Sequence, residues 1–253
     1  MLSRDESAFR RAVLVAVDVM GYGQGDDRQQ MDVQRDLLTV LQWASDGAGV
    51  SRERWDRHPE GDGELAVLPP DVPERRVVGQ FVQQLSAALT RRNEDDRSGP
   101  RLRLRLAIHH GVVAPADNGL AGQGVVAVKR LVDCAPVRAA LRSSGADLAV
   151  VVSAQVFNEM IAQRHTTLRP ADFRQVHVEV KEYTAPAWIW VPGIDPAVLD
   201  LPADRRDQPQ EAAAAAATQP KDRPRQPASA TPTIHNEFHE TVTAENATFG
   251  IRY

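Results

Sequence analysis

The stretch AVLVAVDVMGYG, residues 12–23, sets the expectations for the fold. Six apolar residues, half of them valine, precede Asp18, and two glycines follow within five positions. A continuous apolar run bounded by turn residues is typical of a strand that is buried on both faces. The sequence therefore predicts the carboxylate of Asp18 at the carboxyl end of a buried strand.

A second acidic residue lies in a predicted hairpin. The segment Pro-Glu-Gly-Asp-Gly, residues 59–63, is a turn signal between strand-like runs at 52–57 and 64–68, and it places Asp62 at the tip. If this hairpin lies beside the first strand, both carboxylates meet at one edge of the sheet. Hard divalent cations prefer such oxygen ligands. The alternative is that both aspartates are ordinary turn and cap residues.

Helices and strands alternate through the rest of the first 193 residues. Amphipathic periodicity predicts helices at 27–44, 74–90, 125–141 and 154–163, and apolar or alternating runs predict strands at 101–113, 148–152, 176–180 and 188–191. Arginine and leucine alternate strictly from Arg101 to Leu106, so these arginines are expected to face solvent or a partner. The order predicts an α+β sandwich of ferredoxin-like β-α-β-β-α-β type.

Composition excludes several classes of protein. The chain has 253 residues, 30 Lys+Arg against 34 Asp+Glu and a formal net charge of −4, which removes the electrostatic case for a nucleic-acid binder. The single cysteine, Cys134, excludes an internal disulfide and a cysteine-rich zinc site. The apolar run before Asp18 is too short for a signal peptide or a membrane span. We expect a cytoplasmic protein without nucleic-acid or membrane partners.

The character of the chain changes after residue 193. Prolines recur, residues 212–217 are all alanine, and large apolar residues nearly vanish, which is typical of a disordered linker over 194–232. Apolar residues return in 233–253, a segment rich in Asn and Thr. Such β-prone segments of low charge can pair strand to strand, so a short C-terminal interaction motif with a protein partner is expected there. The alternative is an ordinary disordered tail.

Five segments together resemble a known family. Residues 15–22, 61–67, 104–113, 122–131 and 180–190 are similar, in order and spacing, to the blocks of class III nucleotide cyclases, the adenylate/guanylate cyclase catalytic domains. The resemblance covers about residues 10–192 and implies the fold of that family. It also implies a homodimer, in which two-metal chemistry at one subunit is completed by the other.

The resemblance assigns roles to individual residues. It implies that Asp18 and Asp62 hold Mg²⁺ or Mn²⁺, that Arg130 steadies the transition state, and that Lys181 pairs with the triphosphate. The loop residues that would hold the phosphates through their backbone are Val19, Met20, Gly21 and Tyr22, and the base-reading position is His58.

Three positions depart from the family pattern. Val126 stands where the family has the asparagine that orients the ribose, and it has no hydrogen-bonding group. Losing such a contact typically costs on the order of 10²–10³ in rate. His58 matches neither base-reading pattern, and the second base-reading position falls in the Gly119–Ala121 segment, which lacks polar side chains. The metal and phosphate half of the site is retained, whereas the base and ribose half is eroded.

Two functions therefore remain open. The first is a cyclase-homology signalling domain that binds a nucleoside triphosphate and a divalent metal but is catalytically degenerate. The second is an active cyclase that makes a 3′,5′-cyclic nucleotide and pyrophosphate. A nucleic-acid-binding ferredoxin-like domain is disfavoured, because no aromatic pair interleaves with the arginine row. The segment 233–253 also resembles the short terminal amyloid-type recruitment motifs of bacterial signalling and conflict proteins, on the residues Asn236, Phe238, Val242, Asn246, Phe249 and Gly250.

Overall fold

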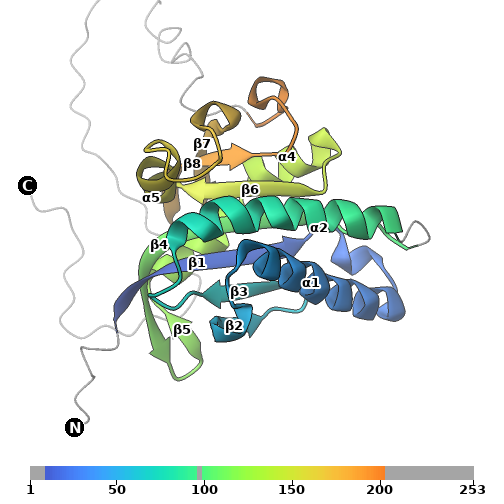
Figure 1. Cartoon of the computed structure of the whole chain (residues 1–253), viewed down its shortest axis with the longest axis horizontal. Coiled ribbons are helices and arrows are strands. Elements are labelled where there is room, and N and C mark those ends of the chain that lie inside the picture. The colour runs from blue at the N-terminus through green and yellow to red at the C-terminus, as the bar shows by residue number, and fades with distance from the viewer. Residues whose placement is uncertain (1–8, 96–98, 203–253) are drawn as a thin grey trace, which may run out of the picture. The chain divides into compact units, whose positions relative to one another are not determined.

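One mixed sheet organises the protein, with strand order β2-β3-β1-β4-β6-β8-β7 and β5 paired to β4 (Figure 1). The computed structural model describes residues 9–95 and 99–202. Its strands are β1 (Arg10–Val19), β2 (Asp56–Pro59), β3 (Gly63–Val67), β4 (Leu104–Ala116), β5 (Gly119–Ala121), β6 (Leu148–Ser153), β7 (Arg174–Val180) and β8 (Tyr183–Trp190). The pairing of β4 with β6 is parallel, and β1 pairs antiparallel with both β3 and β4.

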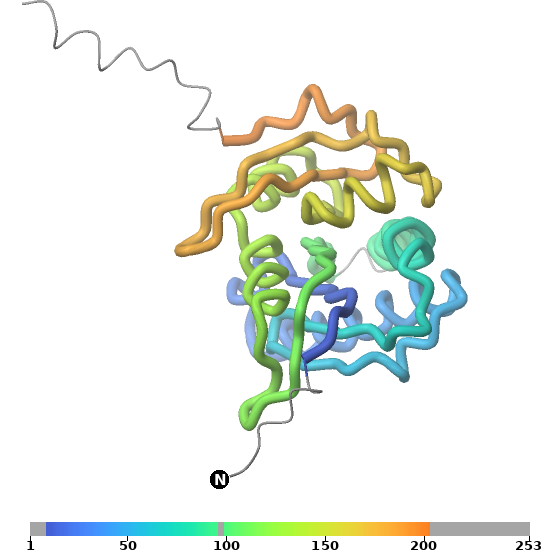
Figure 2. Tube along the Cα trace, turned by 90° about the vertical axis from the view of Figure 1, so that its left-hand side faces the viewer, coloured from blue at the N-terminus to red at the C-terminus, as the bar shows by residue number. Residues whose placement is uncertain are grey.

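Helices cover both faces of this sheet. They are α1 (Asp27–Ala48), α2 (Val82–Asp95), α3 (Gln123–Val132), α4 (Ala135–Ser144) and the short α5 (Ala154–Val156). Figure 1 shows α1 and α2 in front of the sheet, and Figure 2 shows α2 and α3 on opposite sides of it. Two π-helical turns, η4 (Arg76–Phe81) and η5 (Phe157–Ile161), precede α2 and follow α5.

The alternation of side chains along β1 explains why residues 12–17 of this strand are all apolar. Val13, Val15 and Val17 belong to the cluster that packs against α1 and α2, whereas Leu14 and Ala16 belong to the cluster against α3 and α4. Successive side chains of a strand point to opposite faces, so a strand covered on both sides buries all of them. The predicted α+β sandwich and its β-α-β-β-α-β order are confirmed.

Several boundaries differ from the prediction. The helix predicted at 125–141 is two helices, because Pro136 stands in the first turn of α4 and could not be accommodated inside a continuous helix. The run predicted as a strand from residue 52 forms a 3₁₀ turn at Arg52–Arg54, and β2 begins only at Asp56. The helix predicted at 74–90 begins with the π-helical turn η4 and continues to Asp95.

The packed part of the chain extends beyond residue 193. Leu199 is buried, and Ile194 and Leu201 pack against the same cluster as α3 and α4. The remainder of the expected linker and the segment 233–253 lie outside the described residues. None of the helices in the described part of the chain is long and apolar enough to cross a membrane.

Candidate functional site

The pairing of β1 with β3 brings Asp18 and Asp62 to adjacent backbone positions. Asp18 lies opposite Gly63 in the register, and the N–H of Val19 donates to the carbonyl of Asp62 at 2.8 Å. A Cβ at Gly63 would lie 2.2 Å from the carbonyl oxygen of Val17, so only glycine permits this approach. The hairpin therefore lies beside the first strand, at the end that carries Asp18.

A cation neighbours the first carboxylate. Arg105 lies directly across from Asp18 on β4 and forms an ion pair with it, and both side chains are largely buried. Burial is the main cause that raises the pKa of Asp18, and the charges of Asp62 and Asp133 add to this increase. The Arg105 guanidinium acts in the opposite direction and lowers that pKa. Negative charge is thus concentrated at the end of β1 and is only partly balanced.

The donor set fits a divalent cation that arrives with phosphate. Asp18 and Asp62 supply carboxylate oxygens, which suit Mg²⁺ and Mn²⁺. Within the part of the chain that the structure describes, no group of three or more His, Cys, Asp or Glu side chains is placed to hold a metal ion. Mg²⁺ commonly takes one or two protein carboxylates and completes its shell with water and substrate phosphates.

The loop after β1 lines a cavity of about 250 Å³. Val19, Met20, Gly21 and Tyr22 form one wall of it, and the 100–102 segment contributes another. Gly21 has φ 80°, a left-handed conformation that favours glycine. The residues that the resemblance assigns to phosphate binding therefore border a real hollow in the molecule.

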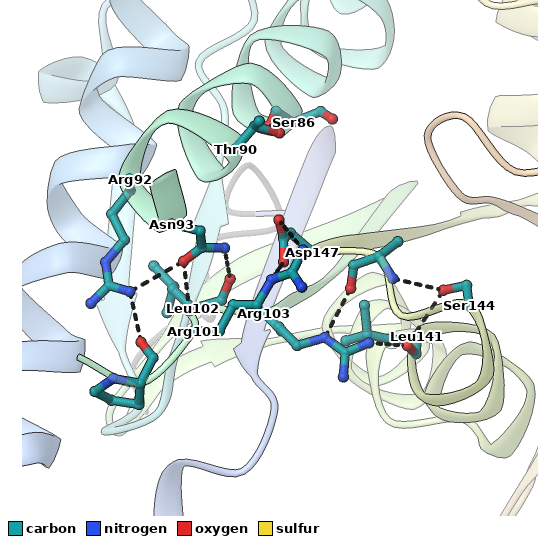
Figure 3. Close-up of polar contacts among 12 residues, drawn as sticks. Ser86, Thr90, Arg92, Asn93, Arg101, Leu102, Arg103, Leu141, Ser144 and Asp147 are labelled. Atoms are coloured by element: carbon teal, nitrogen blue, oxygen red, sulfur yellow. Dashed lines mark hydrogen bonds and ion pairs between the residues drawn. The ribbon is translucent and has the colours of Figure 1, made fainter. Parts of the chain in front are cut away.

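Side chains from two helices fix the walls of this cavity. Nε2 of Gln34 on α1 donates to the hydroxyl of Tyr22 at 2.7 Å and to the carbonyl of Gly61 at 3.1 Å, so it ties the loop to the hairpin. The amide of Asn93 on α2 bonds both backbone groups of Leu102 at 2.9 Å (Figure 3).

The arginines on β4 and in the segment just before it bond to other residues of the same chain. Arg101 pairs with Asp147 at 2.6 Å, and Arg103 donates to the carbonyls of Ala146 and Leu141 (Figure 3). The expectation that these arginines face solvent or a partner is wrong for Arg103 and Arg105. Both have intramolecular acceptors that a sequence pattern alone does not display.

A second group of expected residues gathers around α3. Nη2 of Arg130 lies 3.3 Å from Oε1 of Glu182, and Lys181 precedes Glu182 in the two-residue turn between β7 and β8. Lys181 is exposed and has φ 53°, an unusual conformation for a residue other than glycine. Val126 lies one turn before Arg130 on the same face of α3 and is half-buried.

The two expected base-reading positions lie together. His58 is half-buried on the edge strand β2, with Nε2 3.0 Å from a carboxylate oxygen of Asp56. A Cβ at Gly119 would lie 3.9 Å from Nδ1 of His58. The structure therefore places the backbone of Gly119 near the imidazole of His58, which is paired with Asp56.

Among residues 9–95 and 99–202, no hydrogen bond or ion pair joins Asp18 or Asp62 to Arg130 or Lys181. The sequence analysis did not identify Arg105 and Gln34 as residues that support the end of β1 where Asp18 and Asp62 lie. Arg105 is identifiable only once the register places it across from Asp18. The role of Gln34 depends on how α1 packs over the hairpin.

Comparison with known proteins identifies the fold. A solved structure described as an adenylate/guanylate cyclase/hydrolase from Silicibacter pomeroyi is similar over 74% of this chain and 99% of its own, with 20% identity and a TM-score of 0.53. The guanylyl cyclase Cya2 is similar over 77% of this chain and 98% of its own, with 17% identity and a TM-score of 0.52. No protein-family profile and no curated protein sequence matches the chain.

The described domain has the fold of class III nucleotide cyclase catalytic domains. At these identities the similarity is one of fold, and it spans nearly the whole length of both solved domains.

Proposed function

We propose that this protein binds a nucleoside triphosphate together with Mg²⁺ or Mn²⁺ at the carboxyl end of β1, as a cyclase-homology signalling domain whose catalytic site is degenerate. The pairing of β1 with β3 carries the proposal, because it holds Asp18 and Asp62 at adjacent positions. The loop Val19–Tyr22 beside them borders a cavity and presents backbone groups that phosphates can approach.

Each charged residue has a separate task in this proposal. Asp18 and Asp62 hold the cation, which neutralises charge on the triphosphate when it is bound. Arg105 balances Asp18 when no cation is present, since the two form an ion pair across β1 and β4. Arg130 and Lys181 contact the triphosphate from a second copy of the chain. This arrangement accounts for the lack of a contact between them and the aspartates within one copy.

Two positions, Val126 on α3 and Gly119 on β5, support the proposal that the catalytic site is degenerate. Val126 lies on the same face of α3 as Arg130, at the position where the family has an amide that orients the ribose. The side chain of valine has no hydrogen-bond donor or acceptor. Gly119 beside His58 leaves one imidazole to contact a base. Losing one positioned contact in a transition state costs on the order of 10²–10³ in rate, whereas ground-state binding through the metal and phosphates is retained.

Calorimetric titration of the full chain with each of the four nucleoside triphosphates and Mn²⁺ tests the binding proposal. Asp62→Asn is expected to weaken binding by about tenfold or more, because one carboxylate ligand is lost. Asp46→Asn, an exposed carboxylate on α1, is the matched control and should bind like the wild type. Absence of binding at millimolar triphosphate, or binding unaffected by Asp62→Asn, would contradict the proposal.

The second candidate is an active cyclase that forms a 3′,5′-cyclic nucleotide and pyrophosphate. It is favoured by the position of Arg130, whose guanidinium pairs with Glu182, the residue that follows Lys181 in the turn between β7 and β8. Mass spectrometry of triphosphates incubated with the protein and Mn²⁺ distinguishes the two candidates. A cyclic product that disappears in Asp62→Asn would establish activity. Product formed only by Val126→Asn would show that the missing amide limits the reaction.

We also propose that residues 233–253 recruit a protein partner by strand pairing. The alternation of polar and apolar residues and the low charge of this segment support the proposal. Purified full chain should form thioflavin-T-positive assemblies, and a chain ending at residue 232 should not. Equal fluorescence from both chains would refute this role.

A further inference from the structure

A second, larger cavity lies apart from the carboxylates. It has a volume of about 360 Å³, and its walls come from Arg75, Arg76, Gly79 and Gln80 at the turn η4 before α2 and from residues 165–167 after η5. In Figure 1 this is the region where the start of α2 lies beneath the turns around α5. None of Asp18, Asp62 and the loop Val19–Tyr22 lines it, so it is separate from the site described above.

The lining of this cavity is basic and hydroxyl-rich. Arg75, Arg76 and His165 supply the cationic or ionisable groups, Thr166 and Thr167 supply hydroxyls, and no carboxylate is among the lining residues. The protein as a whole carries a formal net charge of −4, so this group of basic side chains does not follow from a generally basic composition.

Two of these side chains have no partner in the described part of the chain. The guanidinium of Arg75 and the imidazole of His165 make no hydrogen bond or ion pair with residues 9–95 or 99–202. Arg76, by contrast, is held in place, because its Nη1 donates to the carbonyl of Gly49 at 3.0 Å. One positioned arginine and two unpaired basic groups thus border the same hollow.

The backbone on both walls is irregular. Arg76–Phe81 is a π-helical turn, and the opposite wall follows the π-helical turn Phe157–Ile161. Arg164, immediately before that wall, has φ 58°. Such π-helical turns are rare and are frequent at functional sites, and a left-handed conformation at a residue other than glycine stores strain.

The two walls meet at Gly79. A Cβ there would lie 3.2 Å from the Cβ of Thr166, so a larger side chain would push the walls apart. The cavity is therefore formed by direct packing of the two segments and does not depend on a ligand to open it.

We propose that this cavity binds a compact phosphorylated small molecule at a site independent of the carboxylate end of β1. Guanidinium groups match the oxygens of a phosphate in a bidentate manner. The Thr166 hydroxyl accepts from the N–H of Leu168 and keeps its own proton to donate, whereas the Thr167 hydroxyl donates to Gln83. A volume of about 360 Å³ suits one small ligand and is too small for a segment of polymer. Arg75 and His165 contact the phosphate, and Arg76 shapes the rim.

Calorimetric titration of the full chain with inorganic pyrophosphate in EDTA tests the proposal, since the chelator removes any cation from the aspartates. Arg75→Ala and His165→Ala are each expected to weaken binding by about tenfold or more, the effect of losing one charge-assisted hydrogen bond. Both positions are exposed, so folding should be unaffected. Arg142→Ala, an exposed arginine on α4, removes the same charge elsewhere and should bind like the wild type.

Three outcomes would overturn the proposal. The first is an absence of pyrophosphate binding by the wild-type protein at millimolar concentration. The second is an equal loss in Arg142→Ala, which would indicate a non-specific effect of net charge. The third is a loss in Asp62→Asn but not in Arg75→Ala, which would place the probe at the carboxylate end of β1. None of these outcomes bears on triphosphate binding in the presence of Mn²⁺, so the two proposals fail separately.

Discussion

A buried ion pair braces the strand that follows Asp62. Arg52 is 2% exposed and Glu64 5%, and their charged groups lie 2.5 Å apart. Removing one partner leaves an uncompensated buried charge, which typically costs about 3–5 kcal/mol. Arg52→Met should therefore lower the free energy of unfolding by about 3 kcal/mol in urea titrations. The double variant Arg52→Met with Glu64→Leu should recover most of it, and a double variant as unstable as the single one would contradict this reasoning.

His109 makes stability depend on pH. Burial is the main cause that lowers its pKa to about 4 from the usual 6.5, and His110 and Arg11 add to the effect. Between these values the unfolded chain takes up a proton that the folded protein does not, so this residue destabilises the fold as pH falls from about 6.5 toward 4.

His109→Gln should accordingly lose less stability than the wild type between pH 7.5 and pH 5, by about 2 kcal/mol. Urea unfolding of both proteins at the two pH values measures this difference. The raised pKa of the desolvated Glu74 carboxyl has the opposite sign, so the comparison between proteins isolates His109. Parallel losses in the two proteins would show that His109 is not responsible.

At the scale of elements, the β1–β3 contact depends on one glycine. Gly63→Ala would bring a Cβ within 2.2 Å of a backbone oxygen of β1, and neither strand can yield without breaking the ladder. We expect a loss of at least about 2 kcal/mol in unfolding free energy, together with weaker triphosphate binding. Gly23→Ala is the matched control, because no atom lies within 4 Å of the place its Cβ would take and the change should stay within about 0.5 kcal/mol.

The sequence predicts those features that a local pattern of residues determines, and it does not predict those that depend on contacts between distant segments. β1 is predictable because burial on both faces makes residues 12–17 apolar. The aspartate pair is predictable once the turn at 59–63 is recognised. The break between α3 and α4 is marked by Pro136, but the apolar periodicity continues across it and predicts one helix. Arg105 and Gln34 could not be assigned, since their partners are set by strand register and helix packing.

At the scale of the whole molecule, the proposed site needs two copies of the chain. In a homodimer with shared sites, Asp62→Asn and Arg130→Ala each damage both sites. A mixture of the two variants forms heterodimers in which one site carries both changes and the other carries neither. About a quarter of all sites should then regain wild-type affinity for triphosphate. Calorimetry of the mixed proteins measures this fraction. A mixture that binds no better than its components would exclude a shared site.

The distance along the chain between Asp18 and Arg105 has a consequence for folding. The two residues are 87 positions apart, and their contact forms only when β1 and β4 pair at the centre of the sheet. Closing so long a loop carries a large entropic cost, so the contact between Asp18 and Arg105 depends on the folded sheet. Any ligand held there acts on the global unfolding equilibrium. It should therefore protect the entire domain from proteolysis and not merely the hairpin.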